Sequence, residues 1–159
     1  MTVSAAFADT EELQVSKGKF NTYASGVERA YDITGKALMI KTPAGSTIVE
    51  IMVRGLYPNT TYGVHVHNKA CNDTNGGGHY QHVVGGPVDA VNEIWPGFTT
   101  NETGIGVGFA KNDFVAGPDA VSIVIHDTDK ARIACADLAA HQAKPKLKKK
   151  GLKNHRHGE

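Results

Sequence analysis

The sequence predicts an all-β domain, folded as a sandwich or barrel with one long loop. Three observations favour this fold class: glycine is frequent, with 18 residues among 159, strand-like segments recur along the chain, and helical periodicity is weak. Hydrophobic residues at 40% and charged residues at 21% exclude a disordered chain and a coiled coil. No apolar run approaches the roughly 18 residues that a membrane-spanning helix needs, so we expect no membrane span.

Strand patterns occupy most of the chain between its two ends. The β pattern begins at Gln14, and further strands are predicted at residues 33–40, 46–54, 61–67, 105–109 and 121–125. Residues 68–104 are rich in glycine and poor in strand signal, which is typical of a functional loop when such a stretch lies inside a compact domain. The one helix that we expect is short and lies near residues 137–142.

Charge is distributed unevenly and indicates where the domain ends. Residues 1–138 contain 10 basic and 15 acidic side chains, whereas the last 21 residues contain 7 basic and 1 acidic. We therefore divide the chain into an acidic domain, residues 1–142, and a basic tail, residues 143–159. Repulsion between like charges predicts a solvated tail or a linker. The alternative is an arm that contacts a polyanion or a cell surface, and we expect no specific nucleic-acid partner.

Two of the eight histidines form a pair that suits a metal ion. His65 and His67 are two residues apart on a predicted strand, so both side chains lie on one face, while Val64 and Val66 point into the core. Imidazole is a good ligand for copper and zinc. Alone, such a pair is weak evidence for a metal site.

Three more histidines lie where they can complete a site. His79 and His82 follow the glycines of residues 76–78, which permit positive φ or a close approach of the backbone. His126 ends the apolar strand at residues 121–125. Taken singly, His126 is better explained as a satisfied surface histidine at the end of a strand.

The chain has two cysteines, Cys71 and Cys135. Joined as a disulfide, they would tie the long loop to the C-terminal part of the domain and close a loop of about 65 residues. The chain-entropy argument gives such a bond a stabilisation of roughly 4 kcal/mol. Two free buried thiols are the alternative, which a cytosolic location would favour.

The ordered set of these residues resembles the copper/zinc superoxide dismutase family. The resemblance runs from about residue 30 to residue 138, and its motifs end with Arg132-Ile133-Ala134-Cys135. It implies an eight-stranded Greek-key β-barrel, or flattened immunoglobulin-like sandwich, with a long metal-site loop. It also implies an antioxidant oxidoreductase that converts superoxide to oxygen and hydrogen peroxide by cycling between Cu(II) and Cu(I).

The resemblance assigns a role to each residue of the set. The four residues that it implies as copper ligands are His65, His67, His79 and His126. His79 stands where the family has the imidazole that bridges copper to zinc, and in that position it would supply a proton to the substrate. Arg132 corresponds to the arginine that attracts and orients the anion, and Cys71 and Cys135 correspond to the intrasubunit disulfide.

Two departures from the family predict one copper ion per chain and no zinc. The family loop supplies two further histidines and an aspartate to zinc, but Val84, Glu93 and Pro96 stand near those positions here. These residues cannot complete a closed four-ligand zinc shell. Only five residues separate His126 from Arg132, where zinc-containing members have a much longer electrostatic loop. Both features are similar to the copper-only branch of the family.

Glu93 and His82 are candidates for the support of His79. A metal-bound histidine usually gives its other ring nitrogen to a partner, and Glu93 is our hypothesis for that partner. An ordinary surface glutamate is the alternative. His82, three residues after His79, is an alternative third ligand or a remnant of a zinc site.

We expect an extracytoplasmic protein, either secreted, periplasmic or at the cell surface, because disulfides persist in oxidising compartments. Residues 1–13 lack the pattern of a signal peptide. We expect a monomer or a weak dimer. The main alternative function is a module that stores or delivers copper without turnover, although such a site has no use for Arg132. The other alternative is an interaction-only relative, which would be expected to lose ligands.

Overall fold

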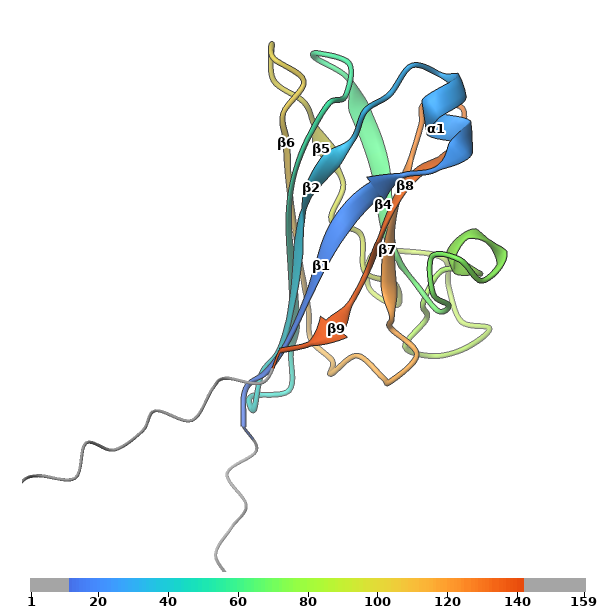
Figure 1. Cartoon of the computed structure of the whole chain (residues 1–159). Coiled ribbons are helices and arrows are strands. Elements are labelled where there is room, and N and C mark those ends of the chain that lie inside the picture. Colours follow the sequence, from blue (N-terminus) through green and yellow to red (C-terminus); the bar gives the residue numbers. More distant parts are fainter. Residues whose placement is uncertain (1–11, 142–159) are drawn as a thin grey trace, which may run out of the picture.

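The computed structural model describes residues 12–141 of the chain (Figure 1). The basic tail predicted at residues 143–159 lies outside the described residues, so its separation from the domain stays a prediction. The described part is nearly all β, with two short helical segments, and this confirms the predicted fold class.

Nine strands and two short helical segments follow one another along the chain. The strands are β1 (Gln14–Thr22), β2 (Thr34–Lys41), β3 (Thr47–Arg54), β4 (Thr61–His67), β5 (Phe98–Thr99), β6 (Gly106–Asn112), β7 (Ser122–His126), β8 (Arg132–Asp137) and β9 (Ala139–Ala140). The helical segments are α1 (Ala24–Glu28) and the 3₁₀ turn η1 (Thr74–Gly76). The predicted strands therefore exist. The long loop predicted at residues 68–104 runs from β4 to β5, and it is shorter than predicted because β5 lies within that range.

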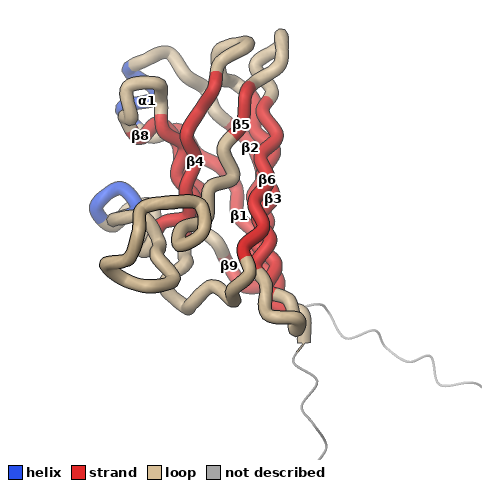
Figure 2. The backbone as a smooth tube through the Cα atoms, turned by 180° about the vertical axis from the view of Figure 1, so that it is seen from behind, coloured by secondary structure: helices blue, strands red, loops and turns tan. Residues whose placement is uncertain are grey.

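The strands form one antiparallel sheet that curls into a nearly closed barrel. The order is β5-β4-β7-β8-β1-β2-β3-β6, and β9 adds to β1. Strands β5 and β6, at the two ends of this order, lie side by side (Figures 1 and 2). Chain neighbours β3 and β4 are not paired, because β3 pairs with β6 and β4 with β7. These crossovers make the connections of a Greek key.

The alternation of residues in the strands explains how the barrel closes around a core. In β3, the side chains of Val49, Ile51 and Val53 are buried, while Glu50 and Met52 between them are exposed. A strand with this period buries one face and leaves the other in water. By contrast, all five residues of β7 are buried, because the long loop covers its outer side, where Gly76 lies against Val124 and Ser122 donates to the Lys69 carbonyl.

The helix predicted near residues 137–142 is wrong. Residues up to Asp137 belong to β8, and Ala139 and Ala140 form β9, which pairs with Lys17 and Ser16 of β1. Alanine and leucine favour a helix locally, but tertiary pairing with an available strand edge outweighs so small a propensity.

The one short α-helix of the described residues lies where the sequence predicts none. Segment α1 follows β1 and packs on β8, where the Tyr23 amide donates to the carbonyl of Ile133 at 2.8 Å. Gly26 lies so close to the same strand that a Cβ on it would be 2.4 Å from the Ile133 carbonyl oxygen. The turn thus depends on backbone contact with β8 rather than on helical periodicity.

A tight hairpin joins β7 to β8. The Asp127 amide donates to the Ala131 carbonyl and the Lys130 amide to the Asp127 carbonyl, both at 2.8 Å. Arg29 from the α1 segment pairs with Asp127 at 3.0 Å and with Asp129 at 2.9 Å. The connection between His126 and Arg132 is therefore short and pinned, in agreement with the predicted shortened loop.

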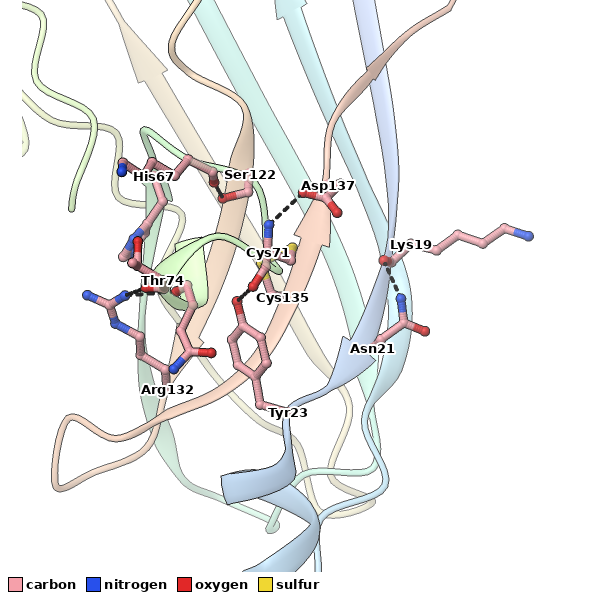
Figure 3. The surroundings of a disulfide bond; sticks show 12 residues. Lys19, Asn21, Tyr23, His67, Cys71, Thr74, Ser122, Arg132, Cys135 and Asp137 are labelled. Carbon is pink, nitrogen blue, oxygen red and sulfur yellow. Dashed lines mark hydrogen bonds between the residues drawn. A yellow bond between two sulfur atoms is a disulfide. The ribbon is translucent and has the colours of Figure 1, made fainter. Parts of the chain in front are cut away.

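The disulfide between Cys71 and Cys135 is present and fastens the long loop to β8 (Figure 3). Its two Cα atoms are 5.8 Å apart. The Tyr23 hydroxyl donates to the Cys71 carbonyl at 2.9 Å, and the Cys71 amide donates to Asp137 Oδ1 at 2.8 Å. Three independent contacts thus hold the start of the loop against the barrel.

Within residues 12–141, no helix has the length and apolar character needed to span a membrane.

Replacing both cysteines by alanine should lower the free energy of unfolding by about 4 kcal/mol, because the unfolded chain regains the entropy of a loop whose ends are separated by 64 residues. Urea denaturation of the metal-free protein measures this loss. The unaltered protein under reducing conditions should lose a similar amount. A loss below about 1 kcal/mol would show that the loop's hydrogen bonds hold it without the covalent link.

Candidate metal centre

The structure brings together the four histidines predicted as ligands. Each of His65, His67, His79 and His126 offers one ring nitrogen, and the four nitrogens lie within 4.8 Å of one another. His65 and His67 come from β4, His126 ends the neighbouring strand β7, and His79 comes from the long loop. Among the residues that the structure describes, this is the one group of three or more His, Cys, Asp or Glu side chains with metal-binding spacing.

Antiparallel pairing positions the three strand histidines. Gly63 pairs with His126 and His65 pairs with Val124, so the ends of β4 and β7 present imidazoles on the same side of the barrel. Val64 and Val66 point into the core, as their period requires. The register between β7 and β8 shifts at Ile125 and His126, where Ile133 of β8 has no partner, so that His126 pairs with Arg132.

The backbone of Val66 joins the remaining ligand segment to β4. Its amide donates to the Ile94 carbonyl at 3.0 Å, and its carbonyl accepts from the Tyr80 amide at 2.8 Å. Val66 lies between His65 and His67, and Tyr80 follows His79. These two bonds therefore fix the position of the loop ligand His79 and of residues 92–95 relative to the two ligands on β4.

The hydrogen bonds of the rings decide which nitrogens are free. His126 uses Nδ1 towards the Lys130 carbonyl at 3.2 Å, and His79 uses Nδ1 towards Glu93 Oε2 at 2.7 Å. The Nε2 atoms of His67 and His126 lie 3.3 Å apart. His65 Nδ1 is buried and has no hydrogen-bond partner. A bound metal ion supplies the partner that a buried unpaired nitrogen requires.

Glu93 lies behind His79 and is almost completely buried, with 1% of its side chain exposed. Its Oε2 also accepts from Trp95 Nε1 at 2.8 Å, and its Oε1 accepts from Gln81 Nε2 at 3.1 Å. Burial alone would raise the pKa of Glu93, but the hydrogen bonds from Trp95, His79 and Gln81 outweigh burial and lower it. A carboxylate accepts, so His79 carries its proton on Nδ1 and leaves the Nε2 lone pair for a metal.

His65, His67 and His126 are held in their neutral form in the absence of metal. Burial, followed by the effect of the neighbouring His79 and His126, lowers the pKa of His65 and of His67 to about 3. Burial also lowers the pKa of His126. Neutral imidazole is the form that binds metal, so no proton has to leave these rings at neutral pH.

Glycine allows the loop to pass beside His67. Gly76 has φ of +90°, and a Cβ on it would lie 2.9 Å from Val124 Cγ2 and 3.5 Å from His67 Nδ1. A side chain at this position would meet both the barrel wall and a ligand, and a left-handed φ would strain it.

Arg132 begins β8 beside the cluster. Its Nη1 donates to the carbonyls of Thr74 at 3.2 Å and Asn75 at 2.8 Å (Figure 3). Its charge lowers the pKa of His67 and of His126, so its field reaches the ligands. The side chain is only partly buried, which leaves the cation accessible to a small anion.

His82 does not belong to the cluster. It is exposed and stacks on Phe114, with ring centroids 4.2 Å apart and an interplanar angle of 7°. Val84 and Glu93 stand near the positions where the resemblance would place zinc ligands. Val84 is 85% exposed and offers no donor atom, while the carboxylate of Glu93 accepts the three hydrogen bonds described above. The absence of zinc stays a prediction.

Sequence reasoning did not identify Trp95, Gln81 and Asn112 as parts of the site. Asn112 Nδ2, buried on β6, donates to the Glu93 carbonyl at 2.9 Å. One signal was available for Trp95, because it lies two positions after Glu93 and an extended segment puts such residues on one side. Gln81 and Asn112 carry no such signal.

The four-imidazole donor set fits a transition metal such as copper or zinc. No protein-family model matches the chain, and a search of curated proteins finds no match.

We expect His65 and His67 in the metal-free protein to show no titration by NMR between pH 8 and pH 5. The unfolded chain binds protons at these residues below pH ~6.5, whereas the folded chain does so only near pH 3. Stability is therefore full above pH ~6.5 and falls as the pH drops towards 3, by about 1.4 kcal/mol per histidine at pH 5.5. Urea denaturation at pH 7.5 and 5.5 measures the loss, and ring signals that shift near pH 6.5 would contradict the burial argument.

Proposed function

We propose that the protein binds one copper ion through its four clustered histidines and disproportionates superoxide to oxygen and hydrogen peroxide without a zinc site. One observation carries the proposal: four imidazoles converge beside the accessible cation of Arg132. A site that only stores a metal ion needs the imidazoles but has no need of the cation.

The choice of copper follows from the reaction and from the donors. Imidazole nitrogens suit Cu(II), whereas zinc has no redox chemistry. When bound, copper supplies a one-electron couple that accepts an electron from one superoxide and returns it to a second. Two superoxide ions and two protons thereby give one oxygen and one hydrogen peroxide.

Arg132 attracts and orients the anion in this proposal. Residues 1–138 carry 10 basic and 15 acidic side chains, so the domain as a whole repels superoxide. Attraction must therefore be local, and a fixed cation next to the site is the group that provides it. The carbonyls of Thr74 and Asn75 hold the guanidinium in place, and because they are neutral they leave its positive charge uncompensated.

His79 handles a proton in this proposal. It is one of the two less buried ligands, with 29% of its side chain exposed, and Glu93 holds its Nδ1 proton. Its Nε2 would bind the metal, and it could pass a proton to the forming peroxide only after it had left the metal and taken that proton from water. We also propose an extracytoplasmic location, where the Cys71–Cys135 bond would persist.

The decisive experiment measures superoxide disproportionation by the copper-loaded protein together with metal analysis. We expect one copper and no zinc per chain, and turnover far above that of an equal amount of copper bound to a histidine-containing peptide. Stoichiometric copper without such turnover would favour storage or delivery of copper. A bound zinc ion would contradict the argument from Val84, Glu93 and Pro96.

Arg132→Ala should lower kcat/KM for superoxide about tenfold, equivalent to ~1.4 kcal/mol, because it removes a cation that is partly screened by water. Arg132→Lys should retain most of the activity. Lys36→Ala, on the distant strand β2, removes the same charge and serves as the control. Equal losses in Arg132→Ala and Lys36→Ala would mean that net charge, and not a local cation, attracts the substrate.

A further inference from the structure

Trp95 contacts the ligand His65 directly and is linked to the ligand His79 through Glu93. We propose that Trp95 is a positioning residue for the metal site. It fixes the Glu93 carboxylate and packs against the His65 ring, so that the rings of His65 and His79 already have their metal-binding orientation before a metal ion binds. The inference rests on the proposed metal site and does not depend on turnover of superoxide.

Four contacts close a ring through these side chains. Trp95 Nε1 donates to Glu93 Oε2 at 2.8 Å, and the same oxygen lies 2.7 Å from His79 Nδ1. The His79 ring stacks on the His65 ring, with centroids 3.9 Å apart and an interplanar angle of 28°. The His65 ring meets Trp95 edge-on, with centroids 5.5 Å apart and an angle of 73°. Movement of any member therefore disturbs its two neighbours.

The shared oxygen makes the indole N–H more than a packing contact. A carboxylate that accepts from His79 alone can rotate about its side-chain bonds and shift the histidine with it. A second donor on Oε2 and the Gln81 donor on Oε1 fix both oxygens of a side chain that is 1% exposed. Such partners of a ligand histidine set its orientation and its tautomer.

The backbone around Trp95 is restrained as well. The preceding Ile94 is fully buried, and its carbonyl accepts from the Val66 amide. The following Pro96 restricts Trp95 to an extended conformation. The Glu93 carbonyl accepts from Asn112 Nδ2 at 2.9 Å. The indole is thus carried by a segment that is tied to β4 on one side and to β6 on the other.

Trp95→Phe separates donation from packing, because phenylalanine keeps a ring against His65 and loses the N–H. We expect this variant to bind Cu(II) about tenfold more weakly in a competition titration, at the lower end of the effect of removing a partner of a metal ligand. We also expect an altered Cu(II) hyperfine coupling in its EPR spectrum. In the metal-free variant, nitrogen-15 spectra of the His79 ring should show a reduced population protonated at Nδ1.

Tyr62→Phe is the matched control. It removes a buried aromatic hydroxyl that accepts from the Tyr57 amide and shares a hydrogen bond with the Tyr31 hydroxyl, and neither bond involves a ligand histidine. Copper affinity, EPR spectrum and His79 tautomer should be unchanged in this variant. The same loss of affinity in both variants would overturn the proposal, because it would reflect general destabilisation.

A double-mutant cycle tests the route through Glu93. In the Glu93→Gln background, adding Trp95→Phe should cost less than about threefold in copper affinity, because the carboxylate that Trp95 fixes is gone. A full tenfold cost in that background would overturn the proposal, and so would an unchanged His79 tautomer in the metal-free Trp95→Phe protein. Because the nitrogen-15 measurement uses no metal, it still tests the role of Trp95 if the dismutase proposal fails.

Discussion

The two backbone hydrogen bonds of Val66 are the constraint on which the metal centre depends. Strands β4 and β7 carry three ligands and would present them without any help from the loop, but the fourth ligand, His79, lies in the loop. The bonds to Ile94 and Tyr80 bring the loop ligand and its carboxylate partner to the outer side of the same strand. The Val66 side chain is also buried in the close-packed core, so the ligands attached to this strand are held as rigidly as the barrel itself.

The loop between β4 and β5 is ordered by buried polar side chains rather than by regular structure. Asn92, only 7% exposed, donates to the carbonyls of Val83 and Pro87 and accepts from the Val83 amide. Asn112 does the same for the other end of the segment by holding Ala90 and Glu93. Buried amides that satisfy backbone groups replace the ladder bonds that strands would make. The loop can therefore cover the outside of β7 without leaving polar groups unpaired.

Strand positions and the ligand histidines were predictable because each carries a signal that is local in the sequence. Alternation in β3 and the spacing of His65 and His67 follow from the geometry of an extended chain, and the order of the histidines and cysteines carries the family resemblance. The contacts inside the loop were not predictable in this way, because the partners of Glu93 come from positions that share no period. The helix α1 was not predicted for a related reason: Gly26 packs against the backbone of Ile133, which lies more than a hundred residues later in the sequence.

The pairing of β1 with β8 and β9 has a consequence for the order in which the chain can fold. Strand β1 is made first, yet two of its partners are the last strands of the described residues. All four ligands precede β8, so during synthesis the complete ligand set emerges before the barrel can be sealed. Contacts of such long sequence separation form slowly, and the edge of β1 stays unprotected until they do. The nascent domain therefore passes through an open sheet. The strand that closes the barrel, β8, also carries Cys135, so closure and formation of the disulfide both become possible once β8 has been synthesised.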